Sequence, residues 1–284
     1  EIATTDRRRM LAVTTADAQA MVEAAQKAGV HLMYGENWVY APSITRAEGL
    51  IITSQGTIVE MRGGECHSGS HSPYSKIWRY TGGGALLRLA THPIGAMLYL
   101  KQQEGLARNG QPIRPIAVSA EVGDLSRIHS VAQEEKPWLV TGWQDVENWA
   151  AVIITFADGS RAVVYASDAV LGGMESKLDI FLSNSHLRCN LSPNNLLESY
   201  APHSNVFGDA YIMEKVSTSA GWSTPIPDED WSSGHLAMCQ DFVAAVAEDR
   251  PAKAEGNLGL EVIRLIYAAY VAAATGQRVE LSSA

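Results

Sequence analysis

The stretch Gly82–Pro93, with the sequence GGGALLRLATHP, is the feature from which the fold of the chain is best interpreted. Its three glycines let the backbone approach a ligand or a neighbouring strand closely, and the helix expected over residues 85–100 offers free N–H groups at its start. His92 lies about two turns into this helix, among mostly apolar residues. A histidine there can exchange a proton near neutral pH, although the local pattern alone slightly favours a structural histidine in the core.

The segments on either side of this stretch predict two different architectures. Upstream, a strand over residues 1–5, a helix from Thr14 to Gly29 and a buried strand over residues 30–34 form a βαβ unit, which implies a parallel sheet. Downstream, we expect helices and alternating β-rich runs, with a hairpin at residues 157–159. The expected helices cover residues 42–53, 235–248 and 258–275, and the expected strands cover 57–62, 116–122, 148–156, 160–167, 176–184, 186–191 and 278–281.

The fold class is therefore predicted to be α/β and α+β. Residues 1–39 form the tail of a parallel α/β sheet, and residues 40–284 form a domain with a large open, mostly antiparallel sheet that helices cover on one face. The stretch over residues 191–231 is rich in Pro, Asn and Ser, and is expected to be an extended loop with short strands.

Composition narrows the function classes. The chain has 284 residues, 46% of them hydrophobic and 19% charged, which is typical of a globular protein. Its net charge of −9 argues against a nucleic-acid partner or an anionic membrane surface. The apolar run over residues 265–274 is far shorter than the roughly 20 residues that a membrane span needs. Three widely spaced cysteines favour a reducing, cytoplasmic location over a disulfide framework.

A second polar stretch contains Glu65, His67 and His71, with Tyr74 shortly after. Imidazole groups and the thiolate of the neighbouring Cys66 can ligate a metal, but Gly69 interrupts the stretch, so the two histidines need not face the same way. Hydrogen bonding to a hydroxylated substrate is at least as well supported, and we predict no metal site.

A third polar stretch, Glu36-Asn37-Trp38, follows the predicted strand at residues 30–34. Ligands of open parallel sheets bind at the carboxyl ends of strands, although an ordinary loop with packed aromatic side chains is the alternative. The chain contains no G-x-G-x-x-G, P-loop, H-E-x-x-H or paired C-x-x-C motif.

Taken in order, several segments resemble the Gfo/Idh/MocA family of NAD(P)-dependent oxidoreductases. They span most of residues 11–281 and comprise Leu11–Asp17, Tyr34–Pro42, Trp78-Arg79 ahead of Gly82–Leu87, His92-Pro93-Ile94, Phe156–Gly159, His235–Val246 and Ile266–Leu281.

The resemblance implies an N-terminal Rossmann domain for NAD or NADP, of which residues 1–39 would be the remnant, and a substrate-binding and oligomerisation domain over residues 40–284. It implies that His92 is the acid/base. The expected substrate wall contains Glu65, His67, His71, Tyr74 and Trp78, and the expected cofactor border contains Glu36, Asn37 and Trp38.

The chain departs from the family pattern at three places. The family usually has Glu-Lys-Pro where this chain has Arg8-Arg9-Met10, often an Asp where it has Arg88, and another acid where it has Gly95. If residues 1–5 are a Rossmann strand and a stretch is missing before Leu11, the lysine has been lost from the chain and Arg9 does not replace it.

These observations predict hydride transfer between NAD(P) and a sugar, cyclitol or related polyol. The alternatives are NAD-assisted glycoside cleavage in the same fold, and a cofactor-free module or a metal-dependent enzyme using the loop at residues 65–71. We also expect a homo-oligomer that associates through the open sheet. The alternation of Val152, Ile154 and Phe156 beside Ala162 and Val164 suggests that these residues form the exposed apolar face.

Overall fold

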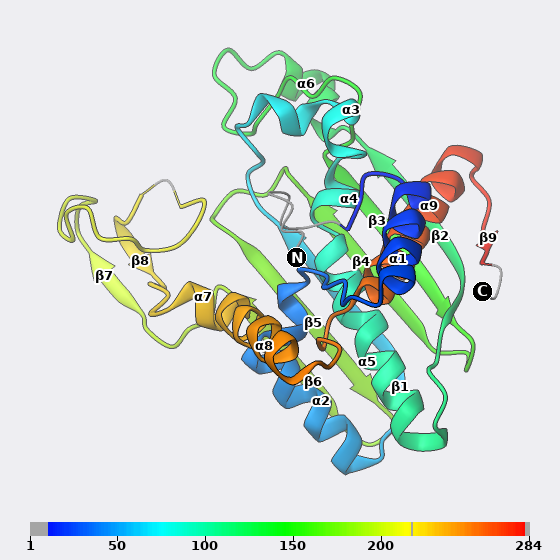
Figure 1. The fold of residues 1–284 in the computed structure, drawn as a ribbon. Coiled ribbons are helices and arrows are strands. Elements are labelled where there is room, and N and C mark those ends of the chain that lie inside the picture. The colour runs from blue at the N-terminus through cyan, green and yellow to red at the C-terminus, as the bar shows by residue number, and fades with distance from the viewer. Residues whose placement is uncertain (1–10, 217, 282–284) are drawn as a thin grey trace.

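An open sheet of seven strands forms the centre of the molecule (Figure 1). The computed structural model describes residues 11–216 and 218–281. Within them the strand order is β6-β5-β1-β4-β3-β2-β9, and β1 with β4 is the parallel pair in an otherwise antiparallel sheet. The strands are β1 (Ile58–Cys66), β2 (Pro115–Gly123), β3 (Trp149–Phe156), β4 (Arg161–Ser167), β5 (Glu175–Leu182), β6 (His186–Ser192) and β9 (Val279–Glu280). This is the open, mostly antiparallel sheet that the sequence predicts.

Helices cover one face of this sheet (Figure 1). α5 packs on β1 and β4, α9 packs on β2, and α2 packs on β6, while α1 lies against α9. Alternation along the strands turns Val152, Ile154 and Phe156 toward the helices, where they are almost completely buried. The helices are α1 (Thr15–Ala28), α2 (Pro42–Ser54), α5 (Thr91–Asn109), α8 (His235–Glu248) and α9 (Gly256–Thr275).

The prediction that Val152, Ile154 and Phe156 form the exposed face of the sheet is wrong. Val152, Ile154 and Phe156 lie on the helix-covered face, so they form the core. The uncovered face carries the alternate positions instead, and among them Ile153 is 50% exposed beside Val163. The alternation was identified correctly, but period 2 alone does not say which of the two faces the helices cover.

Around the N-terminus the structure differs from the predicted βαβ unit. The predicted strand over residues 1–5 lies outside the described residues. α1 is present, with the Thr14 side chain accepting from the Asp17 N–H and Gly29 ending the helix in the left-handed conformation. The segment 30–34 makes one isolated antiparallel bridge, Met33 with Glu255, and Val30 is 53% exposed. Within the described part of the chain no parallel neighbour pairs with this segment, so it is an extended connection and not a strand.

The predicted helix over residues 85–100 is two helices. α4 (Ala85–Arg88) is a single turn, and α5 begins at Thr91 and continues to Asn109. His92 therefore lies in the first turn of α5 and not two turns into a longer helix. The break falls just before the position where Pro93 is accepted, because a proline in the first turn of a helix removes no hydrogen bond.

The long stretch after β6 is an extended loop with short strands, as predicted. β7 (Ser199–Ala201) and β8 (Gly221–Ser223) form a two-stranded arm that projects from one side of the molecule (Figure 1). The arm leads into α7 (Glu229–Ser232), next to α8. The other short elements are α3 (Trp78–Thr81), α6 (His129–Ala132) and the 3₁₀ turns Asn37–Tyr40, Pro73–Lys76 and Leu125–Arg127.

α9 is the one helix in the described residues that is long and apolar enough to cross a membrane by length and composition. Half of its most apolar window is buried inside the protein, against β2, α5 and α1. The core helix of a globular domain meets the same criteria, so this finding is weak evidence for a membrane span.

Candidate active site

His92 and Glu36 form a buried pair at the start of α5. The Nδ1 atom of His92 lies 2.9 Å from Oε1 of Glu36, and the two residues are 4% and 0% exposed. A carboxylate accepts hydrogen bonds, so we assign the proton to Nδ1 of the neutral ring. With the proton on Nδ1, Nε2 is the basic atom of His92.

Local interactions hold the Glu36 carboxylate in place. It accepts from the Trp38 N–H at 3.2 Å, which caps the 3₁₀ turn, and from the Tyr34 hydroxyl at 3.4 Å. Burial, with a smaller contribution from Glu36, raises the pKa of Tyr34 well above its ordinary value, so this hydroxyl stays protonated and remains a donor. Gly95 provides the space, because a Cβ there would lie 2.8 Å from Cγ of Glu36.

Trp38 forms the other side of the histidine. Its ring stacks on that of His92 with 6.0 Å between centroids and 17° between planes. The neighbouring Asn37 side chain donates to the Ser233 carbonyl at 2.7 Å, which connects the 3₁₀ turn to the segment between α7 and α8. The His92 ring is therefore fixed by a carboxylate on one edge and an indole on one face.

The pair borders a cleft of about 440 Å³. Its wall is built from the 3₁₀ turn Asn37–Tyr40, the end of β1, the start of β5 and the end of β6. The loop between β7 and β8 and the turn at α7 complete it. The lining residues are Asn37, Trp38, Glu65, His92, Met174, Leu191, Ser192, Tyr211, Glu214, Ile226, Pro227, Asp228, Glu229, Asp230, Ser233 and His235. A cleft of this volume can hold a monosaccharide or cyclitol.

The structure brings together some of the predicted site residues. Asn37, Trp38, Glu65 and His92 line the cleft, and Glu65 is only 3% exposed. Glu36 is not a lining residue and contacts His92 from the protein interior.

The remaining predicted residues do not line this cleft. His67 is buried, and its Nδ1 accepts from the Gly69 N–H at 2.9 Å. His71 and Tyr74 are exposed on the loop after β1. Trp78 packs in an aromatic cluster, with its ring centroid 5.0 Å from that of Tyr270. Strand β1 ends at Cys66, and the loop beyond it turns away from the cleft, so neighbours in sequence separate in space.

Sequence reasoning missed the acidic turn at α7. Asp228, Glu229 and Asp230 line the cleft together with Glu214 and His235. Three consecutive acids after Pro227 were a visible signal, but such a run more often marks a solvated helix start. Only the packing of α7 next to α8 and the 3₁₀ turn places this run in the cleft.

The triple glycine approaches the protein's own chain. A Cβ at Gly84 would lie 1.9 Å from the Glu147 carbonyl oxygen, and one at Gly83 would lie 2.2 Å from the Tyr270 hydroxyl. The Glu147 carboxylate accepts from the N–H groups of Gly84 and Leu86 at 3.1 and 2.8 Å, so it caps α4. Burial raises the pKa of Glu147. These glycines therefore position α4 and α5 and do not face the cleft.

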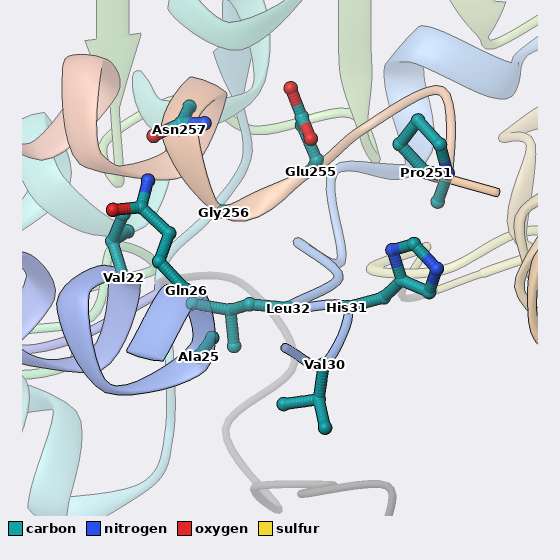
Figure 2. A pocket seen from close by; sticks show the side chains of 11 residues that line it. Val22, Ala25, Gln26, Val30, His31, Leu32, Pro251, Glu255, Gly256 and Asn257 are labelled. Carbon is teal, nitrogen blue, oxygen red and sulfur yellow. The ribbon is translucent and has the colours of Figure 1, made fainter. Parts of the chain in front are cut away.

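Two other possibilities receive no support from the described geometry. Among residues 11–216 and 218–281 no three His, Cys, Asp or Glu side chains form a group that could hold a metal ion. A small pocket of about 90 Å³ lies between α1, the segment 30–32 and the start of α9 (Figure 2). It has room for about three waters and contains none of the predicted site residues.

Comparisons with known proteins identify the fold. Residues 52–188 match the model of the GFO/IDH/MocA C-terminal domain. No curated protein matches the chain. Among solved structures, GenD2 from gentamicin A biosynthesis, in complex with NAD, is 25% identical with a TM-score of 0.77, over 96% of this chain and 70% of that one.

More distant structures share the fold. Myo-inositol 2-dehydrogenase from Lactobacillus plantarum is 14% identical with a TM-score of 0.68, over 96% of this chain and 72% of that one. The WlbA dehydrogenase from Bordetella pertussis, in complex with NADH and UDP-GlcNAcA, is 16% identical with a TM-score of 0.63, over 96% and 71%. Residues 52–188, with the strands of the open sheet that they contain, are therefore a GFO/IDH/MocA C-terminal domain, and the chain as a whole has the fold of these solved dehydrogenases.

Proposed function

We propose that this protein is an oxidoreductase that transfers a hydride between NAD(P) and a sugar, cyclitol or related polyol. The observation that carries the proposal is the buried His92, held through Nδ1 by Glu36, at the wall of a cleft of monosaccharide size. Solved structures with the same fold include a myo-inositol 2-dehydrogenase and a dehydrogenase in complex with NADH and UDP-GlcNAcA, which supports this reaction class.

Asn37 and Trp38 suit the border of a nicotinamide ring, because a planar apolar indole and an amide lie on the cleft wall next to His92. When bound, NAD(P) accepts or returns the hydride at the substrate carbon. We propose that residues 1–39 belong to a Rossmann-type domain that holds the remainder of the dinucleotide. Arg8, Arg9 and Met10, which stand directly before Leu11 where the family usually has Glu-Lys-Pro, lie outside the described residues.

The proton is handled by the chain's own residues. Nε2 of His92 takes the proton of the substrate hydroxyl as that carbon is oxidised, and returns it in the reverse direction. Glu36 stabilises the imidazolium that forms and keeps the ring in one orientation. Glu65 is part of the proposed substrate wall. We propose no substrate contact for the other predicted wall residues, which lie outside the cleft, namely His67, His71, Tyr74 and Trp78.

The test is kinetic and uses the full-length protein with NAD, NADP and a panel of polyols. His92→Ala should lower kcat/KM by about 10²–10⁴-fold, the usual contribution of general acid–base catalysis. His129→Ala, on α6 and away from the cleft, is the matched control. A His92→Ala protein that keeps wild-type turnover would overturn the proposal. Release of sugar from a glycoside without net NADH would instead assign NAD-assisted cleavage to the same site.

We also propose that the protein associates through the uncovered face of the sheet. Ile153 and Val163 are neighbours on that face and are partly exposed to solvent. Burying such a patch between copies is favourable. Ile153→Glu should convert an oligomer to monomers in light scattering, and a wild-type protein that is monomeric at micromolar concentration would contradict the proposal. We further propose a cytoplasmic location, because the three cysteines are free, as is usual in a reducing compartment.

A further inference from the structure

The helix α8 presents an apolar side to solvent. Of its 14 residues, all of which the structure describes, Ala245 alone is buried. Val243 is 72% exposed, and Leu236, Cys239 and Val246 are exposed as well. Their spacing of three and four residues places these four on one side of the helix, which we call the α8 face. Single exposed apolar residues are common, but a contiguous row of them marks a contact surface.

Polar contacts on the opposite side fix α8 in the fold. Asp241 accepts from the Tyr40 hydroxyl at 2.9 Å and from the Lys253 N–H at 2.8 Å. Arg250 donates to the same carboxylate at 2.8 Å. The ring of Phe242 packs edge-on against that of Tyr40, with 6.1 Å between centroids. The described fold therefore holds α8 without using the α8 face.

The two ends of α8 lie beside two parts of the proposed dinucleotide-binding domain. Just before its start, the Ser233 carbonyl accepts from Asn37, the proposed nicotinamide border, at 2.7 Å. Just after its end, Asp249 lies 3.3 Å from His31, which belongs to the segment 30–34 of that domain. The 14 residues between them span about 21 Å. A domain that includes segment 30–34 and holds a dinucleotide at Asn37 therefore extends along α8.

A solved relative contains a region large enough to be such a domain. This chain spans 70% of the GenD2 structure, which is in complex with NAD. The remaining part of GenD2 amounts to about 120 residues, the size of an ordinary domain.

A second copy of the chain is the other candidate for covering the α8 face. The surface proposed above for association between copies is the uncovered face of the sheet. α8 lies instead among the helices on the covered side, where it contacts α7 and the 3₁₀ turn Asn37–Tyr40 (Figure 1). The α8 face is thus continuous with the side of the molecule that contains the cleft, and this position favours the dinucleotide-binding domain.

We propose that the α8 face is the surface on which the dinucleotide-binding domain of this protein packs. The proposal rests on the proposed function for the identity of that domain. An apolar contact along α8 fixes the orientation of the domain relative to Asn37 and His92. The α8 face therefore helps to position the cofactor without touching it.

Cys239 provides a direct probe, because it lies on the α8 face while Cys66 and Cys189 are buried. The full-length protein is treated with iodoacetamide at pH 8, and peptide mass spectrometry measures the label on each cysteine. We expect Cys239 to be alkylated at least about tenfold more slowly than in the urea-unfolded protein, because the covering domain excludes the reagent. Alkylation of native Cys239 at the rate found in urea would overturn the proposal.

A matched pair of variants tests the contact itself. Val246→Glu places a charge in the α8 face, and should raise the alkylation rate of Cys239 by about tenfold or more, because a buried unpaired charge is costly. Val271→Glu changes an equally exposed valine on α9 and should leave Cys239 protected. Thermal melting confirms that both variants are folded. Protection that survives Val246→Glu would overturn the proposal.

Dilution distinguishes the two occupants of the α8 face. A domain of the same polypeptide protects Cys239 at every protein concentration, because its effective concentration is fixed by the linker. Protection that disappears between micromolar and nanomolar protein would assign the face to a second copy and overturn the proposal.

Turnover of polyols is measured on the same preparations, so that the two proposals can fail separately. Protein that protects Cys239 but oxidises no polyol contradicts the proposed function and supports the domain contact. Protein that oxidises polyols while Cys239 reacts freely overturns the domain contact and leaves the dehydrogenase in place.

Discussion

Replacing Glu36 by glutamine isolates the charge of the buried pair. A glutamine Oε1 can still accept from Nδ1 of His92 and from the Trp38 N–H, so the hydrogen bonds to that oxygen are kept while the charge is lost. Two unit charges about 4 Å apart interact by about 4 kcal/mol at an effective dielectric constant of about 20. At 1.36 kcal/mol per pH unit this value corresponds to about 3 units, and measured effects of one neighbouring charge are about 1–3 units.

The assay is the pH dependence of kcat/KM for polyol oxidation. The neutral imidazole is the base, so the rate falls as the pH falls through the protonation of His92. Without the Glu36 charge the imidazolium is less favoured, and the midpoint of this acidic limb should move to lower pH by about 1–3 units. The weaker base should also give a lower plateau at high pH.

Two controls make the result specific. Glu48→Gln removes another partly buried carboxylate, which accepts from the Tyr99 hydroxyl at 2.8 Å and does not contact His92. The acidic limb of kcat/KM for the Glu48→Gln protein should keep the wild-type midpoint. Gly95→Ala forces a Cβ to within 2.8 Å of Cγ of Glu36, and it should lower kcat in the wild type but little in a Glu36→Ala background. A Glu36→Gln enzyme with an unchanged acidic midpoint would refute the pairing as a functional contact.

Three further predictions concern stability and reactivity. Lys101→Met should lower the free energy of unfolding in urea by about 3 kcal/mol, because the buried Glu104 loses its closest cation and keeps only Arg108 at 3.3 Å. Burial acts to raise the pKa of Asp158, but hydrogen bonds, led by that from Lys101, hold it below its ordinary value. The stability of the wild-type protein should therefore fall as the pH drops below about 4. The Lys101→Met protein should lose less stability over the same pH range. Gly84→Ala should destabilise by at least about 1–3 kcal/mol, whereas Gly49→Ala, in open space on α2, should stabilise by about 0.5–1 kcal/mol. Burial raises the pKa of Cys66 to about 12, so this thiol should resist alkylation at pH 8 until urea unfolds the protein.

Much of the sheet was predictable because its strands are covered on one face only. β3 and β4 alternate buried and exposed positions over their length, and the residues 157–159 between them form a tight turn. α8 (His235–Glu248) has the bounds that the sequence predicts. In these elements the local pattern and the tertiary environment favour the same structure, which is the condition for correct prediction from sequence.

The pairing of Glu36 with His92 was not predictable from local pattern. Glu36 and His92 are 56 residues apart in the sequence. Gly84 donates its N–H to Glu147, which lies 63 residues later. Nothing in the sequence near either partner specifies the other. The acidic turn at Asp228 was missed for the same reason, since a run of acids before a helix has an ordinary explanation in the helix dipole. Long-range packing alone assembles these groups.

The two departures from the family pattern in the helical region have one physical explanation. Where the family often has an acid at position 95, this chain has Gly95, and the side chain of Glu36 occupies the space beside it. Where the family often has Asp, this chain has Arg88, whose guanidinium binds the fully buried Asp168 and lies 5.3 Å over the Trp143 ring.

In both places a carboxylate is present in the interior but is supplied by another segment. A buried guanidinium beside Asp168 needs that acid, because an unpaired charge in the interior costs several kcal/mol. Glu36 likewise keeps a negative charge at the start of α5, where His92 requires one. Motif comparison by position counts these sites as losses. In this chain His92 and Arg88 each have an acidic partner, Glu36 and Asp168, although the acids lie far from them in the sequence.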